Sequence, residues 1–236
     1  MKTVIALSGG LDSAVLLHYA KHVLKHEIVL AVSFNYGSKH NPYENDAALR
    51  IASEYGVPWR LVTIPPVVFS DSGSALTDGF VPVPEGHYEE ESMRKTVVPF
   101  RNGVMLSILA AIAESIAVRY NEPHQIMIGA HAGDHFIYPD CRPTFLNSME
   151  QTIHYGTGEM VLLGSPFMYM TKDAVVRLGK AHGFNQWVNT RTCYAPQPVA
   201  CGKCGACQER LQSFAANGMI DPISYVSREI LPKKGA

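Results

Sequence analysis

The chain has 236 residues, of which 47% are hydrophobic and 17% charged, with 20 Lys and Arg against 21 Asp and Glu. This composition supports a sizeable buried core and excludes a disordered chain, which would be poor in apolar residues and rich in charge. The net charge of -1 argues against a large nucleic-acid-binding surface. No apolar run approaches the ~18 residues that cross a bilayer, and glycines interrupt the apolar start after Leu7. We therefore expect a cytoplasmic protein with no signal peptide and no membrane association.

Apolar strand patterns and helical patterns alternate along most of the chain. Strands are expected at 2–7, 27–34, 59–64, 125–130 and 160–163, and helices at 12–25, 42–55, 102–120, 142–154 and 171–182. Asn102 and Thr171 are expected as helix N-caps, and Asp221 with Pro222 is expected to start a last short helix. The alternation predicts an α/β fold, a doubly wound parallel sheet with right-handed crossovers.

The stretch 65–100 interrupts this alternation with five prolines, three glycines and an acidic run at 89–91. A loop of this length is usually functional or disordered, so it is either a mobile surface insertion or a lid or partner-contact segment. We expect residues 1–190 to form one α/β domain that contains this insertion. Residues 191–236 are expected to form a small C-terminal extension.

The segment Leu7-Ser8-Gly9-Gly10-Leu11-Asp12-Ser13 follows the first strand and opens the first helix. Open α/β sheets bind phosphates at this position, where glycines expose backbone N–H groups and the helix N-terminus carries partial positive charge. Asp12 would repel a phosphate, so it is expected either to cap the helix or to help hold Mg²⁺. Neither the Walker A ending nor the Gly-x-Gly-x-x-Gly fingerprint is present.

Four of the five cysteines form the pattern C-x7-C-x2-C-x2-C, at Cys193, Cys201, Cys204 and Cys207. Five cysteines are too few for a disulfide framework, and four crowded thiolates close a tetrahedral structural zinc site. An iron–sulfur cluster is the alternative. We expect one structural Zn²⁺ per chain that orders the C-terminal extension. Cys141 stands apart and is expected to be a small buried hydrophobe rather than a functional thiol.

The string Ser-Gly-Gly-x-Asp-Ser resembles the pyrophosphatase loop of the ATP-pyrophosphatase enzymes, which transfer AMP to a substrate oxygen. Together with the cysteines it makes the chain resemble the 7-cyano-7-deazaguanine synthase family of queuosine and related deazaguanine biosynthesis. The other matching segments are 34–40 with its Tyr-Gly-x-x-His pattern, 98–102, 129–134, the Tyr-Pro-Asp-Cys-Arg stretch at 138–142, and Thr192-Cys193-Tyr194. Such segments run over most of the chain.

The resemblance implies an adenine-nucleotide α-hydrolase-like fold and an AMP-forming ligase that makes a nitrile. ATP would adenylate 7-carboxy-7-deazaguanine, ammonia would displace AMP to give the amide, and a second ATP would activate the amide oxygen for its loss. Adenylation is chemically sensible because hydroxide is a poor leaving group, while Mg²⁺ and the loop neutralise the pyrophosphate. The implied partners are 7-carboxy-7-deazaguanine, ammonia and ATP with Mg²⁺. A homodimer is one option for the oligomeric state, which the sequence leaves open.

The resemblance and the position of each residue in the predicted fold give the candidate site residues. The catalytic candidates are Asp12, Ser13, Arg101 and Asp134. The nucleotide-binding candidates are Leu7, Ser8, Gly9, Gly10, Leu11, Asp12, Ser13, Ala14, Val15, Leu16, Leu17, Lys39 and His40. The substrate candidates are Asp134, Tyr138, Asp140 and Arg142.

Each of these residues also has a structural interpretation. Arg101 would contact a phosphate or carboxylate or form a surface salt bridge, and Asp134 would contact a ligand or cap a helix. Lys39 and His40 would face phosphate or base, or solvent. The stretch 138–142 would read a pterin-like base edge or pack as a turn. His131 and His135 are expected as substrate contacts or core histidines rather than metal ligands.

Three other functions remain open. A related enzyme could stop at the amide or attach the deazaguanine to another molecule. Another ATP-pyrophosphatase enzyme could amidate or thiolate a different substrate, although one acting on transfer RNA would be more basic. A zinc-ribbon interaction module with a decayed ATP loop is disfavoured, because the loop string is intact.

Overall fold

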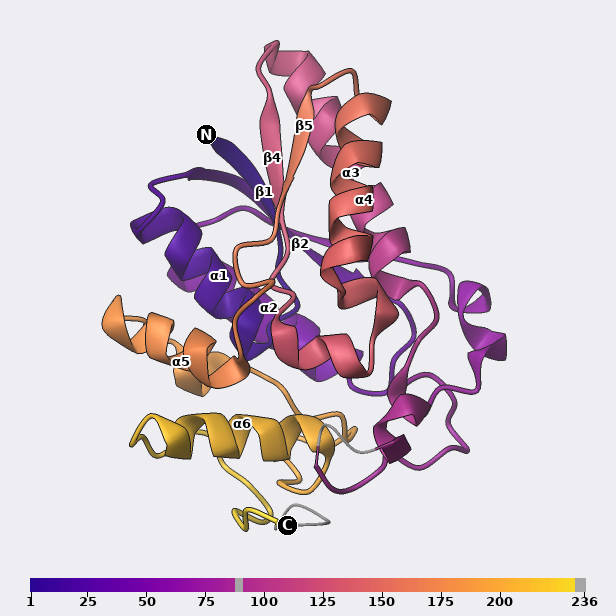
Figure 1. Ribbon diagram of the computed structural model, residues 1–236, viewed down its shortest axis with the longest axis vertical. Coiled ribbons are helices and arrows are strands. Elements are labelled where there is room, and N and C mark those ends of the chain that lie inside the picture. The colour runs from indigo at the N-terminus through magenta and orange to yellow at the C-terminus, as the bar shows by residue number, and fades with distance from the viewer. Residues whose placement is uncertain (88–90, 232–236) are drawn as a thin grey trace.

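A computed structural model describes residues 1–87 and 91–231. It contains a five-stranded sheet formed by β1 (Lys2–Ala6), β2 (Glu27–Asn35), β3 (Trp59–Thr63), β4 (His124–Met127) and β5 (Val161–Gly164). The strand order is β3-β2-β1-β4-β5, and every neighbouring pair is parallel. The predicted doubly wound parallel sheet is therefore confirmed (Figure 1).

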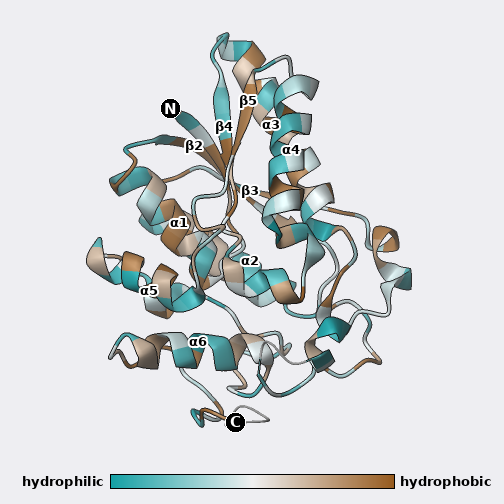
Figure 2. Cartoon of the chain, in the orientation of Figure 1, coloured by the Kyte–Doolittle hydropathy of each residue, from teal (hydrophilic) through white to brown (hydrophobic). Residues whose placement is uncertain are grey.

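Helices cover both faces of the sheet. The six α-helices are α1 (Leu11–His22), α2 (Asn41–Glu54), α3 (Arg101–Tyr120), α4 (Pro143–Gly156), α5 (Lys172–Ala181) and α6 (Gly205–Ala216). Adjacent strand residues supply opposite cores: Val4 lies in the core with α3 and α4, whereas Ile5 lies in the core with α1, α2 and α5. The central strands β1 and β2 are buried on both faces, so most of their residues are apolar, whereas the edge strand β3 is largely exposed. Figure 2 shows the hydropathy along the chain.

The strand order places a ligand crevice at one edge of the sheet. β1 lies between β2 and β4, so the chain turns to opposite sides at β1, and such a switch point opens a crevice at the carboxyl ends of the strands. Gly129, just past β4, approaches α1 closely. A Cβ on Gly129 would lie 3.2 Å from the Asp12 carbonyl carbon, so glycine lets the two segments meet here.

α3 is the helix that, within the described residues, has the length and apolar composition to cross a membrane. It instead packs against β1, β4 and β5, with Leu106, Leu109 and Ala113 completely buried. Its environment is that of a core helix.

The described part of the 65–100 stretch packs onto the domain. It forms short 3₁₀ helices at Pro66–Val68, Ser70–Ser72 and Glu91–Thr96, and its residues Phe69, Leu76 and Met93 belong to the core on the α3 face. The interpretation as a mobile surface insertion is therefore wrong for these residues, because their apolar side chains are buried. Glu89 and Glu90 of the acidic run lie outside the described residues.

Two predicted helix starts are wrong. Phe100, in a left-handed conformation, is the N-cap of α3, and Asn102 lies inside the helix. The Asn102 backbone N–H donates to Asp140 Oδ2 at 2.8 Å, so Asp140 supplies a hydrogen-bond acceptor to the first turn of α3. Asp221 starts no helix, because its carboxylate is engaged by Arg210 of α6.

α6 itself was not predicted. It lies beside α5, at the end of the molecule away from the tip of the sheet (Figure 1).

Candidate active site and metal centre

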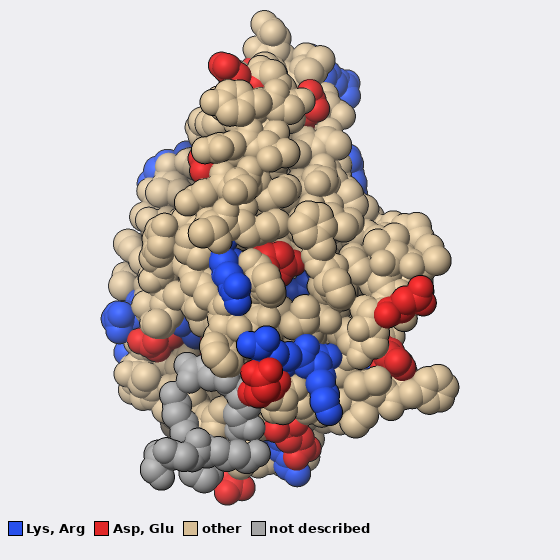
Figure 3. Space-filling model, turned by 45° about the vertical axis from the view of Figure 1, so that its right-hand side comes forward, with Lys and Arg blue, Asp and Glu red and all other residues tan. Residues whose placement is uncertain are grey.

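A cavity of about 220 Å³ opens at the carboxyl ends of β1, β2 and β4. Its wall combines the loop after β1, the first turns of α2 and α3, the segment after β4, the start of α5, the segment 191–194 and α6. One face of the molecule carries Lys, Arg, Asp and Glu side chains gathered near its middle, rather than a continuous basic patch (Figure 3). This mixture agrees with the net charge of -1.

The loop after β1 is held open by its own hydrogen bonds. The Ser8 backbone N–H donates to Ser13 Oγ at 3.2 Å, the two serine hydroxyls lie 3.0 Å apart, and Ser13 Oγ donates to the Gly10 carbonyl at 3.1 Å. Gly9 has a φ of 79°, and a Cβ there would lie 2.3 Å from the Glu44 carbonyl oxygen. Only glycine fits this position, which seats the loop against α2.

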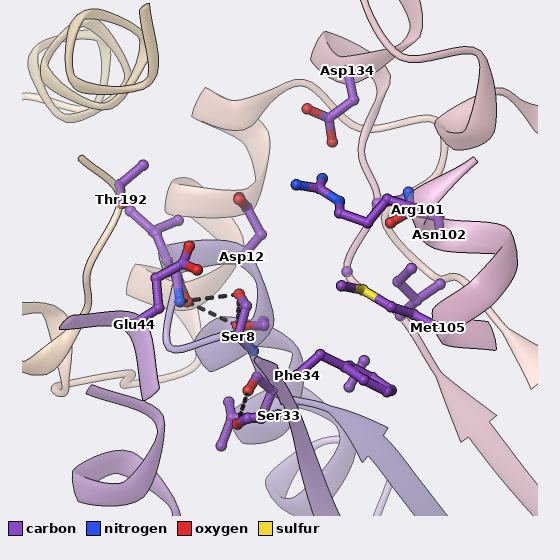
Figure 4. A pocket seen from close by; sticks show the side chains of 18 of the residues that line it. Ser8, Asp12, Ser33, Phe34, Glu44, Arg101, Asn102, Met105, Asp134 and Thr192 are labelled. Carbon is purple, nitrogen blue, oxygen red and sulfur yellow. Dashed lines mark hydrogen bonds between the residues drawn. The ribbon is translucent and has the colours of Figure 1, made fainter. Parts of the chain in front are cut away.

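Asp12 does not cap α1. The N-cap is Gly10, and its backbone N–H donates to Ser8 Oγ at 3.2 Å. Asp12 Oδ2 instead accepts a hydrogen bond from Lys172 Nζ at 2.7 Å. The capping interpretation is thus wrong, and Asp12 points toward the cavity (Figure 4).

Lys172 joins three parts of the chain. Besides Asp12, its ammonium lies 3.3 Å from Glu209 Oε2 and 3.2 Å from His131 Nε2, and the whole residue is 6% exposed. Burial opposes the charge on Lys172, but Asp12 and Glu209 outweigh it and raise the pKa of the ammonium. A positive charge therefore stands beside the loop after β1. His131 also lies 3.7 Å from Asp134 Oδ2, which brings Asp134 to the same cluster.

One carboxylate oxygen of Asp12 is left for a ligand. Within the described residues, Asp12 Oδ1 is buried and accepts no hydrogen bond. A carboxylate oxygen without a partner is the kind of hard ligand that Mg²⁺ takes, usually with phosphate oxygens and water. The residues present therefore fit the Mg²⁺ expected here.

Arg101 enters the cavity from the first residue of α3, opposite Glu44 (Figure 4). Its guanidinium donates to the Tyr36 hydroxyl at 3.0 Å and lies over the rings of Tyr36 and Tyr138, 5.4 Å and 6.0 Å from their centres. Tyr138 is in turn 3.2 Å from the Tyr194 hydroxyl. These aromatic rings orient a cation and offer flat apolar surface to a planar ligand.

Most of the predicted site residues meet at this cavity. Its wall includes Leu7, Ser8, Gly10, Leu11, Asp12, Ser13, His40, Arg101, Asp134 and Tyr138. The other predicted site residues, apart from the cysteines, lie off the wall: Gly9, Ala14, Val15, Leu16, Leu17, Lys39, Asp140 and Arg142. Lys39 donates to the Val81 carbonyl and Arg142 to the His135 carbonyl, while Asp140 holds the start of α3.

Four charged residues on the wall were not among the predicted site residues: Glu44, Lys172, Arg191 and Glu209. Tyr36 and Tyr194 also line the wall, in segments that match the family but were given no role. Lys172 and Glu209 lie 160 and 197 residues beyond Asp12 in the chain, so no local pattern links them. Glu44 had a signal, because it follows His40 by four residues at the start of a predicted helix, and such residues share a face.

The four clustered cysteines form a second centre outside the cavity wall. Their sulfurs lie within 4.8 Å of one another, and Cys201 Sγ is 3.9 Å from Cys207 Sγ. Tetrahedral zinc with Zn–S bonds of about 2.3 Å requires sulfurs about 3.8 Å apart. Backbone N–H groups of Cys201 and Cys204 donate to the sulfurs of Cys193 and Cys201, which favours thiolates. The arrangement can hold one metal ion.

Comparisons with known proteins match most of the chain. Residues 2–218 match the family model described as queuosine biosynthesis protein QueC. The 7-cyano-7-deazaguanine synthase of Psychromonas ingrahamii is 40% identical over 95% of this chain and 97% of its own. The 7-cyano-7-deazaguanine synthase 1 of Colwellia psychrerythraea is 42% identical over 95% of this chain and 98% of its own. Among solved structures, the U34-tRNA thiolase NcsA of Methanococcus maripaludis matches at 17% identity over 78% of this chain and 58% of its own, with a TM-score of 0.44.

Proposed function

Because the chain belongs to the family of queuosine biosynthesis protein QueC, we propose that it converts 7-carboxy-7-deazaguanine and ammonia to 7-cyano-7-deazaguanine with ATP. The observation that carries the proposal is the meeting of the Ser8–Ser13 loop with two cations, Lys172 and Arg101, in one cavity. A carboxylate and a triphosphate are both anions, and both must be held while AMP is transferred between them.

The loop and Lys172 are the proposed pyrophosphate site. Backbone N–H groups at the start of α1, the hydroxyls of Ser8 and Ser13, and the Lys172 ammonium all stabilise negative charge as pyrophosphate leaves. Asp12 would hold Mg²⁺ through its unpartnered oxygen, and the ion would neutralise the phosphate oxygens when it is bound. Asp12 also keeps Lys172 charged and in place.

Arg101 and the tyrosines are the proposed deazaguanine site. Arg101 would pair with the carboxylate that is to be activated, while Tyr36 and Tyr138 present aromatic rings to the planar base. Asp134 is the candidate for hydrogen bonding to the base edge. With these contacts the amide would stay bound between two rounds of adenylation at one nucleotide site.

The cysteine centre is proposed to hold one structural Zn²⁺. Four thiolates close the coordination sphere and leave no position for a reactant, so the metal would order the segment 193–207 and the start of α6. The reaction uses ATP, which suits a cytoplasmic enzyme. The boundary between a 1–190 domain and a 191–236 extension stays a prediction.

The test is a product analysis with 7-carboxy-7-deazaguanine, ATP, Mg²⁺ and ammonium. We expect the nitrile by mass, with two AMP released per nitrile, because two oxygens must leave and each needs its own adenylation. One AMP with the amide as the end product would contradict the nitrile step and favour the amide-forming or conjugating activity. No AMP in the presence of this substrate would contradict the proposal as a whole.

A further inference from the structure

Glu44 and His40 both line the cavity, and the proposed steps above leave them without a role. Figure 4 shows Glu44 on the side of the cavity opposite Arg101. Both belong to the start of α2, and Glu44 Oε2 is 3.5 Å from His40 Nε2. The side chain of Glu44 is 17% exposed and that of His40 is 1% exposed. Two side chains that can accept hydrogen bonds are thus largely buried and still line the cavity.

The other nitrogen of His40 is unused. Within the part of the chain that the structure describes, His40 Nδ1 is buried and has no hydrogen-bond partner. Burial lowers the pKa of His40 to about 3, and Arg101, Arg191 and Lys39 act in the same direction. The imidazole is therefore neutral at pH 7, and a neutral imidazole accepts a hydrogen bond at one nitrogen.

Glu44 is surrounded by groups from four segments. Arg101 comes from α3, Arg191 from the segment before the cysteines, Tyr36 from the end of β2, and His40 from α2 itself. Both arginines are engaged elsewhere: Arg101 donates to Tyr36, and Arg191 donates to the carbonyls of residues 195, 197 and 198. Asn41 Nδ2 donates a long hydrogen bond of 3.4 Å to Glu44 Oε2. Glu44 thus has no direct ion pair with an arginine within the described residues, and its carboxylate can accept from a further small donor.

The carboxylate is also tuned for proton transfer. Burial raises the pKa of Glu44 to about 7, although Arg101 and Arg191 oppose the rise. A base whose pKa is near the working pH is half-ionised and gains or loses a proton easily.

The position of Glu44 relative to the nucleotide loop is fixed by close packing. A Cβ on Gly9 would meet the Glu44 carbonyl oxygen at 2.3 Å and the Ala48 backbone nitrogen at 2.7 Å, so the loop lies directly on this turn of α2. This packing therefore fixes the distance between Glu44 and the loop that is proposed to hold ATP.

We propose that Glu44 and His40 form the ammonium subsite of the cavity, where ammonium gives a proton to Glu44 before its nitrogen attacks the adenylated carboxyl carbon. This inference rests on the proposed function. Ammonium carries four N–H donors and one positive charge, which a carboxylate and a neutral imidazole satisfy. At neutral pH nearly all ammonia is protonated and has no lone pair, so the reaction needs a proton acceptor here.

The step balances without any further reactant. One N–H proton of ammonium moves to a Glu44 oxygen, and the freed nitrogen lone pair forms the C–N bond. The C–O bond to AMP then breaks and its electron pair leaves with the AMP phosphate. The nitrogen loses a second proton to water to give the neutral amide, and no atom is oxidised or reduced.

The test separates adenylation from amine attack in Glu44→Gln. Carboxylate-dependent exchange of pyrophosphate into ATP needs no ammonia, and hydroxylamine is neutral at pH 7 and attacks without prior loss of a proton. We expect the variant to keep the exchange and the reaction with hydroxylamine. Its kcat/KM for ammonium should fall by about 100-fold, the usual contribution of a general base.

Two further variants make the result decisive. Glu54→Gln changes an exposed glutamate at the other end of α2 and should match the unaltered protein in all three assays. Glu44→Asp keeps a carboxylate and should recover part of the ammonium activity, which separates loss of the base from misfolding of the Gln variant.

The outcomes against the inference are distinct. Unchanged use of ammonium by Glu44→Gln, or an equal loss with hydroxylamine, would overturn the subsite. Absence of the exchange from the unaltered protein would remove the proposed function, and the subsite with it.

Discussion

Two buried cations, Arg210 and Lys172, show how different two ion pairs in one chain can be. Arg210 is completely buried and binds both oxygens of Asp221, at 2.6 Å and 2.9 Å, while its remaining N–H groups reach Thr190, Thr192 and the Trp187 carbonyl. Asp221 is completely shielded too. Every charge and donor in this pair is matched.

Lys172 has the opposite character. It contacts two carboxylates and a histidine, yet one oxygen of its closest partner, Asp12, accepts no hydrogen bond within the described residues. The Lys172 cluster borders the cavity, whereas Arg210 and Asp221 do not. A fully matched buried pair organises a fold, and a buried cation with an unmatched neighbour at a cavity marks where a ligand completes the set.

Metal removal should have the largest effect on the C-terminal segment. Cys204 and Cys207 stand at the start of α6, so loss of the ion releases the helix that carries Arg210. The binding free energy of structural zinc is about 10–16 kcal/mol in zinc-finger peptides. We expect the ion to add several kcal/mol to the free energy of unfolding here. A chelator should lower Tm strongly and added Zn²⁺ should restore it. Native protein that contains iron and sulfide, or no metal, would contradict the zinc assignment.

Arg210→Met should destabilise the fold by about 3–5 kcal/mol, because it leaves the buried Asp221 carboxylate without a counter-ion. Denaturant unfolding measures the change. Arg228→Met changes an exposed arginine that donates to the backbone carbonyls of Asp221 and Ile223, so it is the matched control and should cost far less. If Arg210→Met were as stable as the unaltered protein, the distinction between the two ion pairs would fail.

Lys172→Met should reduce activity strongly and stability only a little. We expect kcat for AMP release to fall by about 100- to 1000-fold, as for loss of one charge-stabilising donor. The free energy of unfolding should change less than in Arg210→Met, because the cavity admits water to Asp12 and Glu209. Pyrophosphate exchange measures the loss of activity, and denaturant unfolding of the same preparation measures the change in stability. Unchanged exchange would exclude Lys172 from the pyrophosphate site.

Glu44 should give the smallest effect, visible as a pH dependence of stability. Its pKa in the folded protein, about 7, lies above the ordinary value of 4.5, so the folded state binds more protons between these values. Stability from this group is therefore greatest at low pH and is lost as the pH rises through 7, by about 3 kcal/mol at most. Glu44→Gln should lose this dependence. Parallel unfolding curves for both proteins across this range would contradict the shift.

The sequence predicted the parts of the molecule that depend on local chemistry. Apolar runs such as 4–7 indicate strands buried on both faces, and the Ser8–Ser13 string follows β1, where the strand order reverses. The cysteine spacing likewise brings four sulfurs together.

The parts that depend on tertiary contacts were missed. Lys172 is drawn into the site by Asp12, a residue far away in the chain, and Asp221 looked like an N-cap because its partner Arg210 is invisible to local patterns. α6 was hidden by its polar composition, although Cys207, Arg210, Leu211 and Phe214 all lie on the buried side at three- and four-residue steps.

The contact between Arg191 and the nucleotide loop has a consequence for how this chain can be recombined. The Arg191 backbone N–H donates to the Gly9 carbonyl at 2.7 Å, and its guanidinium gathers the carbonyls that precede Cys201. The loop conformation is thereby bonded to the route that the chain takes into its metal centre. A chimaera that takes residues 191–231 from a relative should work only when it also takes the loop at 7–13 from that relative. In evolution, the loop and the cysteine segment are therefore expected to be inherited as one unit.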